Sequence, residues 1–404
     1  MHGRTFAGIA STGLPSGPSL PLVSIIVINF NYARYIGETI KSIRVQRYPS
    51  FEVVIVDNAS DDGSRKIIEQ HVDGDTRFRI IHMDRNALAM NAFLRGLAET
   101  TGEFVSVVDA DDYLLEGYLS AHVQTHLSAS PGVAFTSCNV FEVSERNEIL
   151  CGSRQPHSRP KASSEYIMIA RSLAPNVPEI SASAYDILKE SVRFYRPITN
   201  GWLWMPGTSN VYRRSILDIV KPKAGSEQSQ VLSVDGYFCY ACHWIAGSSV
   251  IDKPYSAYRI HGQNFYASMP SITGVRKAGG PAVARLPLRR RYTLDTILQN
   301  AANIEASVGA KTFWRIVDQA IFNLRNPLTV ELRDKEFINV FVANMSGLLR
   351  TFGKGPTLRE LSVRLPARIL AGITRSGGYK ISLRMKLTLL RYKIKQKIRL
   401  PFCK

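Results

Sequence analysis

Short runs of β-branched residues that alternate with helical patterns dominate the first part of this chain. Such apolar runs are typical of strands buried on both faces, and helices that alternate with them connect the strands of a parallel sheet. The chain is therefore predicted to be an α/β protein with a Rossmann-like, mostly parallel sheet, whose ligands bind beyond the carboxyl ends of its strands. The predicted strands are 24–29, 51–56 and 79–82, and the predicted helices are 35–46, 65–71 and 87–99.

An acidic sequence, Asp109-Ala-Asp111-Asp112, ends a fourth apolar run that begins at residue 105. Asp109 and Asp111 are two residues apart, so on a strand both side chains project to the same side. Their hard oxygen ligands suit Mg²⁺ or Mn²⁺, and these ions usually accompany phosphates. Asn29 and Asp57 end two other predicted strands, so these polar groups are expected at one sheet edge. For the acidic sequence alone, a strand end that caps the next helix is an open alternative.

Four motifs, in this order, resemble those of family 2 glycosyltransferases, which have the GT-A fold and invert the anomeric centre. They are Ile28-Asn-Phe-Asn31, Val56-Asp-Asn-Ala-Ser-Asp-Asp-Gly-Ser64, Asp109-Ala-Asp-Asp112, and the paired segments Val234-Asp235 and Tyr258-Arg-Ile-His-Gly-Gln-Asn264. The resemblance implies a GT-A domain over residues 22–270.

The chain divides into three parts on this interpretation. Within the GT-A domain, residues 22–130 are the expected donor-binding half and residues 131–270 the expected acceptor and catalytic half. Residues 1–21 are rich in Gly, Ser and Pro and are predicted to be a flexible N-terminus. Residues 271–404 carry helical patterns and are predicted to form a mainly helical, basic C-terminal region.

The resemblance implies a metal site. Asp111 would be a ligand of Mg²⁺ or Mn²⁺, Asp109 would hold the metal's water shell or the ribose, and His261 would complete the metal environment. A bound cation can stabilise the charge that develops on a departing diphosphate. His261 could instead only form a hydrogen bond within a loop.

The resemblance also implies a nucleotide pocket. Phe30 would stack on the nucleobase, Asn31 belongs to the same donor-binding motif, and Asp57 would accept a hydrogen bond from the base imino group. Both Phe30 and Asp57 have structural alternatives, since Phe30 could lie in the core and Asp57 could cap the next helix. The pocket favours a uridine or thymidine donor, that is, a UDP- or dTDP-sugar.

Asp235 is the predicted general base. An inverting transfer needs a group that removes the proton of the acceptor hydroxyl as its oxygen attacks the sugar. Asp235 resembles the second member of the family's Glu-Asp pair, and a predicted helix over 236–246 would favour its ionised form. The alternative is a helix cap.

Two departures from the family pattern limit the resemblance. Val234 replaces the Glu that usually precedes the base, and Phe93-Leu94 stands where many members carry Arg-Asn. A contact with the nucleotide-sugar donor would then be missing, or Arg85 or Arg95 would make it instead. A catalytically inactive relative is therefore an alternative to an active enzyme.

Composition agrees with an enzyme of the cytoplasm. The hydrophobic content of 45% is ordinary for a chain that buries a sizeable interior. No apolar stretch reaches the roughly 20 residues of a membrane-spanning helix. With five Cys and no signal peptide pattern, the chain is expected to be reduced.

Three smaller patterns have structural interpretations. The segment Cys239-Tyr-Ala-Cys242 is expected to pack inward on a helix, because no second Cys pair completes a zinc site. His122 and His126 are one helical turn apart and are expected on a solvated face. Trp202 and Trp204 could either stack on an acceptor sugar or pack in the core.

The C-terminal tail is strongly basic. After Glu360 the chain has twelve Lys and Arg and no acidic residue, which accounts for most of the formal net charge of +18. An apolar stripe runs between basic faces and would let a helix lie on an anionic membrane, on the enzyme or on a partner. The stripe consists of Leu383, Leu387, Leu390, Ile394 and Ile398.

The expected partners follow from this pattern. The acceptor is predicted to be a saccharide or a lipid-linked saccharide of the cell surface, on the basis of the basic tail and the resemblance. A basic protein that binds nucleic acid is the alternative, but the charge is confined to the tail and is not interleaved with aromatic residues. The predicted location is cytoplasmic, with peripheral contact to the membrane.

Overall fold

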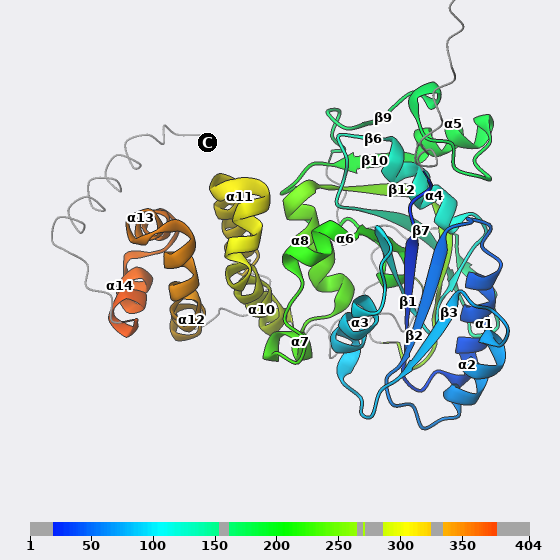
Figure 1. Cartoon of the computed structure of the whole chain (residues 1–404). Coiled ribbons are helices and arrows are strands. Elements are labelled where there is room, and N and C mark those ends of the chain that lie inside the picture. Colours follow the sequence, from blue (N-terminus) through cyan, green and yellow to red (C-terminus); the bar gives the residue numbers. More distant parts are fainter. Residues whose placement is uncertain (1–18, 153–160, 265–269, 271–285, 325–333, 378–404) are drawn as a thin grey trace, which may run out of the picture.

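The computed structural model describes residues 19–152, 161–264, 270, 286–324 and 334–377 (Figure 1). Its strands are β1 Val23–Asn29, β2 Phe51–Asp57, β3 Phe78–His82, β4 Phe104–Asp109, β5 Tyr113–Leu114, β6 Ala129–Ser130, β7 Phe135–Val143, β8 Ile149–Cys151, β9 Ile167–Met168, β10 Val192–Tyr195, β11 Asn210–Arg213 and β12 Ser248–Arg259. A ten-stranded sheet has the order β10-β12-β7-β11-β4-β1-β2-β3, with β5 paired to β12 and β8 to β7. β6 and β9 form a separate pair.

The first half of the sheet is parallel, which confirms the predicted α/β class. β1 pairs in parallel with both β2 and β4, and β2 pairs in parallel with β3. The register sets Asn29 beside Asp57 and Ile28 beside Asp109. The carboxyl ends of these three strands therefore meet at one edge, where ligands of such sheets bind.

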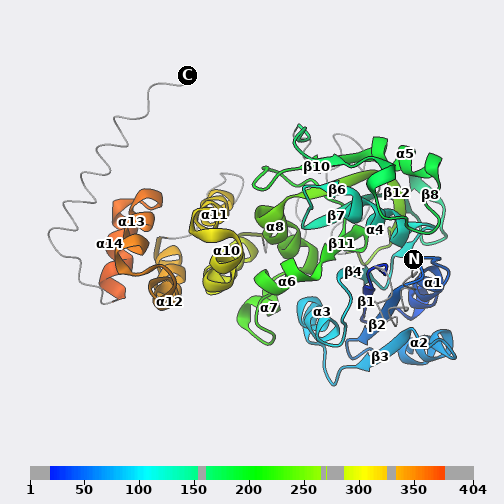
Figure 2. The same cartoon turned by 45° about the horizontal axis from the view of Figure 1, so that its top comes forward.

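Both faces of this parallel part are covered, which explains the continuous apolar runs. Alternate residues of one strand belong to two separate cores, so Ile26 packs with α3 (Leu88–Ala98) and Ile25 packs with α1 (Ala33–Arg44). Figure 2 shows α1 and α2 (Ser64–Val72) on one side of the strands and α3 on the other. Burial of both faces is what a parallel sheet requires.

The second half of the sheet is mixed. β11 runs antiparallel between β4 and β7, and β12 pairs in parallel with β7. α5 spans Ala182–Ser191, and the chain then enters β10. α6 (Arg214–Val220), α7 (Glu227–Val231) and α8 (Val234–Ala246) lie on the α3 side.

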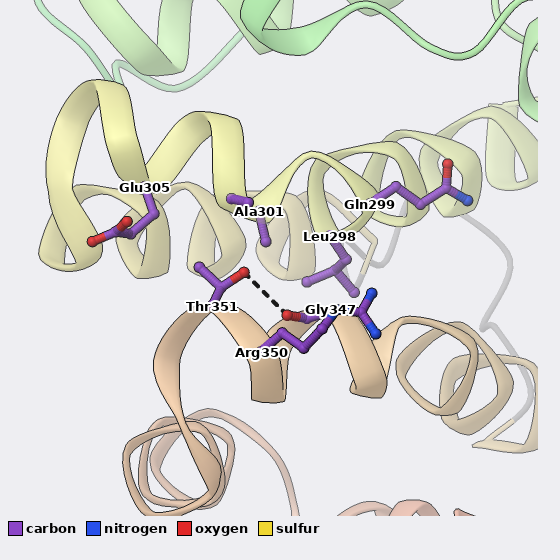
Figure 3. Close-up of a pocket in the computed structure, with 8 residues that line it drawn as sticks. Leu298, Gln299, Ala301, Glu305, Gly347, Arg350 and Thr351 are labelled. Carbon is purple, nitrogen blue, oxygen red and sulfur yellow. Dashed lines mark hydrogen bonds between the residues drawn. The ribbon is translucent and has the colours of Figure 1, made fainter.

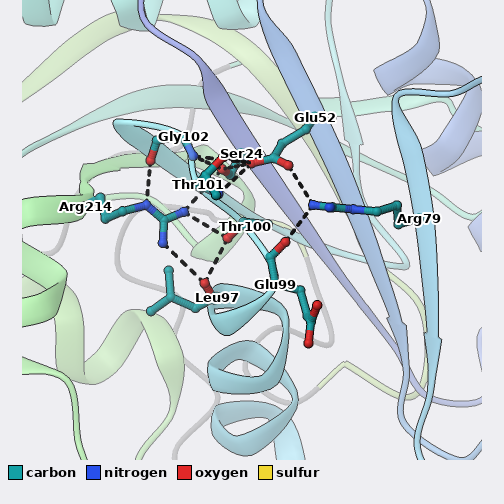
Figure 4. A network of polar contacts seen from close by, with 9 residues as sticks. All are labelled: Ser24, Glu52, Arg79, Leu97, Glu99, Thr100, Thr101, Gly102 and Arg214. Carbon is teal, nitrogen blue, oxygen red and sulfur yellow. Dashed lines mark hydrogen bonds and ion pairs between the residues drawn. The ribbon is translucent and has the colours of Figure 1, made fainter.

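A polar network joins the two halves at the amino ends of the strands (Figure 4). Arg214, at the start of α6, donates to the carbonyl oxygen of Gly102 at 2.6 Å and to Thr100 Oγ1 at 2.9 Å. Glu52 accepts from Ser24 Oγ at 2.8 Å. This network lies at the sheet edge opposite to Asp109, so it belongs to the scaffold.

The described residues after 285 are helical, as predicted for the C-terminal region. The helices are α10 Leu286–Gln299, α11 Ala301–Leu324, α12 Asp334–Phe352, α13 Lys354–Arg364 and α14 Ala367–Ser376. α10 packs against α7 and α8, and the later helices extend away from the sheet (Figure 2). α11 is kinked at Gly309, whose φ is 78°.

A cavity of about 370 Å³ opens within this helical region (Figure 3). Its wall comes from α10, α11 and α12 and includes Leu298, Gln299, Glu305 and Arg350. Among the described residues, no helix combines the length and apolar character needed to cross a membrane. The apolar stripe predicted over 383–398 lies outside the described residues.

Two of the smaller sequence patterns agree with the structure and one does not. Cys239 and Cys242 are fully buried, as predicted. Trp204 packs in the core and donates from Nε1 to Ser248 Oγ at 2.8 Å, which settles its open alternative. The prediction of a solvated face for His122 and His126 is wrong, because both side chains are buried on α4 (Tyr118–Ser128).

Candidate active site

The acidic sequence lies at the carboxyl end of β4 and in the turn to β5. Asp109 is partly buried, while Asp111 and Asp112 are buried. Burial, together with the negative charges of Asp111 and Asp235, raises the pKa of Asp109 to about 8. The charges of two other carboxylates therefore act on Asp109 at the carboxyl end of β4.

Asp112 has structural partners. Its Oδ2 accepts from Thr208 Oγ1 at 2.8 Å and its Oδ1 accepts from the main-chain N–H of Arg259 at 3.0 Å. Thr208 Oγ1 also accepts from the main-chain N–H of Asp109 at 3.1 Å. Asp112 therefore ties the end of β4 to β12.

His261 contacts Asp111 directly. His261 Nε2 lies 2.9 Å from Asp111 Oδ2, and both side chains are almost completely buried. The Nδ1 atom accepts the main-chain N–H of Gln263 at 3.2 Å, so the ring proton of the neutral imidazole is on Nε2 and is donated to Asp111. In this conformation His261 is a hydrogen-bond donor, and it can become a metal ligand only if Gln263 N–H leaves Nδ1.

Tyr32 is a member of this cluster that the sequence prediction missed. Burial raises the pKa of Tyr32, and the negative charges of Asp111 and Asp109 add to this effect. Its ring meets the ring of His261 edge to face, with the centroids 5.8 Å apart. The signal available in the sequence was its position, directly after the Ile28-Asn-Phe-Asn31 motif.

Asp235 approaches the cluster from α8. Its charge acts on Asp109, so the structure brings together two acidic groups that are far apart in sequence. Burial raises the pKa of Asp235, against hydrogen bonding from Gly236 N–H and the positive charge of Arg289. The N-cap of α8 is Ser233, so Asp235 is not the cap residue that the alternative interpretation required.

The predicted nucleotide residues occupy the neighbouring strand ends. Phe30 follows β1 directly and has 39% of its surface exposed, so it is not a core residue. Asn31 adopts a left-handed φ of 60°, and its N–H donates to Ser60 Oγ at 3.0 Å. These contacts hold the Phe30 turn against the loop that follows β2.

Asp57 is fully buried at the end of β2. Its Oδ1 accepts from Asn29 Nδ2 at 3.0 Å and its Oδ2 accepts from Arg65 Nε at 2.8 Å. Burial raises the pKa of Asp57, but the hydrogen bonds from Ser60, Arg65 and Asn29 outweigh it and hold the pKa below its usual range. The N-cap of the next helix is Gly63, so Asp57 does not cap it.

The residues that depart from the family pattern are packed in the core. Val234, Phe93 and Leu94 are all buried, and the Phe93 ring meets Phe238 edge to face. Arg95 pairs with Glu99 at the far end of α3, away from the acidic cluster, so it does not rebuild the missing donor contact.

The donor set fits a hard divalent cation. The acidic side chains at the carboxyl end of β4 concentrate negative charge, which adds to burial in raising the pKa of Asp109 and which a bound cation would offset. Among the described residues, no group of three or more His, Cys, Asp or Glu side chains is already arranged to bind a metal ion. Mg²⁺ in particular is commonly held by one or two carboxylates together with waters and substrate phosphates.

The chain has relatives of known family. Residues 24–183 match the family model for glycosyl transferase family 2. An uncharacterized glycosyltransferase of a Nostoc species is 28% identical over 278 residues, which are 69% of this chain and 76% of that protein. The Campylobacter jejuni GalNAc(5)-diNAcBac-PP-undecaprenol beta-1,3-glucosyltransferase is 30% identical over 129 residues, 32% of this chain and 41% of that protein.

One solved structure aligns with most of this chain. The Staphylococcus aureus protein TarS, crystallised with UDP-GlcNAc, aligns over 88% of this chain and 90% of its own, with 18% identity and a TM-score of 0.47. Residues 24–183 match the family 2 model and contain the parallel strands and alternating helices of the sheet, so this part of the chain is a glycosyltransferase family 2 domain.

Proposed function

We propose that the protein is a metal-dependent, inverting glycosyltransferase that moves a sugar from a nucleoside-diphosphate donor to a saccharide or lipid-linked saccharide. The observation that supports this most strongly is that the charge of Asp235, on α8, acts on Asp109, which ends β4 two residues before Asp111. One reaction needs both a cation site and a base, and the charge of the proposed base acts on one of the proposed cation ligands.

Asp111 and Asp109 would hold Mg²⁺ or Mn²⁺, and His261 would join them once Gln263 N–H has left its Nδ1 atom. When bound, the cation stabilises the charge that develops on the diphosphate leaving group. The remaining oxygen ligands would come from water and from the donor phosphates.

Asp235 would act as the general base. The acceptor oxygen forms a bond to the anomeric carbon as the bond from that carbon to the diphosphate breaks, and the hydroxyl proton passes to Asp235. The base must be ionised before transfer. Gly236 N–H and the charge of Arg289 favour the ionised form, although burial opposes it.

The donor and the acceptor are inferred less directly. An exposed Phe30 beside Asp57 suits a stacked pyrimidine, which supports a UDP- or dTDP-sugar. The name of the Campylobacter jejuni relative describes a lipid-linked saccharide acceptor, and this supports an acceptor of the same class in cell-surface polysaccharide synthesis. We place the enzyme in the cytoplasm, with the basic tail in contact with the membrane.

Screening nucleotide sugars for hydrolysis in Mn²⁺ and in EDTA tests the proposal. Wild-type protein should release the nucleoside diphosphate in Mn²⁺ only. Asp111→Ala should lose this turnover and the response to Mn²⁺, whereas Asp235→Asn should still bind the nucleotide but fail to transfer the sugar to an acceptor. Wild-type rates in either variant would contradict the role given to that residue.

A further inference from the structure

Arg259, at the end of β12, is buried beside the acidic cluster and makes directed contacts with three separate segments. Its Nε donates to the main-chain oxygen of Asp111 at 2.9 Å. Its Nη1 donates to Asn147 Oδ1 and its Nη2 donates to Glu38 Oε2, each at 2.6 Å. Every nitrogen of the guanidinium group is thereby directed at a named acceptor.

Glu38 and Asn147 also contact each other, so the three side chains close a ring. Asn147 Nδ2 donates to Glu38 Oε1 at 2.6 Å. Asn147 lies in the turn between β7 and β8 with a φ of 64°, a left-handed conformation that Asn tolerates better than most residues. The ring therefore joins α1, which carries Glu38, to the β7–β8 turn and to β12.

Two aromatic rings flank the guanidinium group. The Arg259 Cζ atom lies 5.0 Å from the centroid of Tyr35 and 5.3 Å from that of Tyr113. Tyr35 also stacks on His261, with the centroids 5.2 Å apart. Arg259 thus touches the main chain of Asp111 directly and the ring of His261 through one intermediate side chain.

The charge balance of this group depends on Glu38. The Arg259 side chain has 1% of its surface exposed, and a buried guanidinium group is costly unless a carboxylate compensates it. Glu38 supplies that carboxylate and is itself 42% exposed. Removal of Glu38 leaves Arg259 charged, buried and without its ion pair, so Arg259 must shift and the Asp111 carbonyl must lose its fixed donor.

We propose that Glu38, Asn147 and Arg259 form a positioning triad that sets the affinity of the Asp111 site for its divalent cation. This inference rests on the proposed function, because it assigns the triad to the metal site of that function. The three residues act through the main chain of Asp111 and touch neither the cation nor the sugar. Partners that hold metal ligands in place typically change metal affinity by about 10- to 100-fold when they are mutated.

Mn²⁺ binding to the full-length protein, measured by electron paramagnetic resonance of the free ion in the presence of UDP, tests this role without turnover. Glu38→Ala is expected to weaken Mn²⁺ binding by about tenfold or more. Glu38→Gln keeps the side-chain shape and loses the charge, and it should weaken binding by a smaller factor. Because Glu38 is partly exposed, both variants are expected to fold, which circular dichroism checks.

Glu145→Ala is the matched control. Glu145 lies in the same β7–β8 turn and pairs with Arg34 of the same helix α1 at 2.5 Å, but both side chains are exposed. Its loss should leave Mn²⁺ affinity within about twofold, as is usual for exposed pairs. An equal loss in Glu145→Ala and Glu38→Ala would overturn the triad, because it would show that any loosening of this turn has the same effect.

Two further outcomes separate the triad from the proposed function. If Asp111→Ala abolishes Mn²⁺ binding and Glu38→Ala leaves it within twofold, the positioning role is wrong and the metal-dependent function stands. If wild-type protein does not bind Mn²⁺ with UDP, the metal-dependent function and the triad are both wrong.

Discussion

The side chains around the acidic cluster differ in how firmly they are held. Asp57, Asp112 and His261 each have directed hydrogen-bond partners, whereas Phe30 projects from the end of β1 with a large exposed surface. An exposed aromatic ring beside buried polar groups is poorly explained by stability alone, and it is well placed to cover a flat ligand.

Phe30→Ala tests this use of the ring. Stacking of an aromatic side chain on a base contributes about 1–3 kcal/mol, so the KM for the donor should rise by roughly 5- to 150-fold. The melting temperature should change little, because Phe30 packs weakly. Leu173→Ala, at a position that is 74% exposed and lies away from β1, is the control and should leave KM unchanged. An unchanged KM in Phe30→Ala would exclude the stacking role.

The strand ends were predictable from the sequence, and the loops around them were not. Asn29, Asp57 and Asp109 follow apolar runs, and parallel strands that are neighbours must end at one edge. The contribution of Tyr32 and the hydrogen-bonded state of His261 depend on turn conformation and on one main-chain N–H, which no periodicity encodes.

At the scale of elements, α4 shows how a pattern can mislead. Two His residues one turn apart predicted a polar, solvent-facing side of the helix. Nearly every residue of α4 is instead buried between the sheet and α5. His122 and His126 are neutral there, because burial lowers the pKa of each ring. His122 Nδ1 contacts Thr136 Oγ1 at 2.5 Å. His126 Nε2 donates to the carbonyl oxygen of Val211 at 2.9 Å, so the ring proton of His126 is on Nε2.

These buried rings predict that the protein loses stability in acid. Burial lowers the pKa of His122 from 6.5 to about 3, so the unfolded chain binds more protons than the folded chain between these values. Stability therefore falls as the pH drops below 6.5, by about 2 kcal/mol for this residue between pH 6.5 and 4.5.

Denaturant unfolding at pH 6.5 and 4.5 measures this difference. His122→Gln should reduce the loss of unfolding free energy between the two pH values by about 2 kcal/mol, whatever its effect on absolute stability. His126 and His243 are also buried and have lowered pKa values, so part of the acid sensitivity should remain. An equal loss in the variant and in the wild type would show that His122 is already charged in the folded protein.

At the scale of the whole molecule, the helical region is connected to the proposed base. α10 packs on α7 and α8, with Gln228 Nε2 donating to Asp295 Oδ2 at 2.6 Å. The same helix carries Arg289, whose charge lowers the pKa of Asp235. The sequence predicted that this region is helical, but the docking of α10 depends on side chains 67 residues apart, which a local pattern cannot reveal.

Arg289→Met tests this connection. Loss of the positive charge should raise the pKa of Asp235, so the acidic limb of the profile of kcat/KM against pH should move to higher pH. Arg291→Met, on the same helix, removes a charge that lies 4.0 Å from Glu227 and should leave the limb in place. A profile that moves equally in both variants would show a general loss of positive charge and no specific effect on Asp235.

The most direct test of the central claim is the position of the cation relative to Asp111 and Asp235. The anomalous diffraction of a crystal grown with UDP and Mn²⁺ would locate the ion without any assumption about turnover. We predict one strong peak within bonding distance of Asp111, at about 2.0–2.3 Å, with the UDP diphosphate beside it and Asp235 facing the same cleft. A peak bound elsewhere, or UDP in a cleft that Asp235 does not reach, would contradict the account.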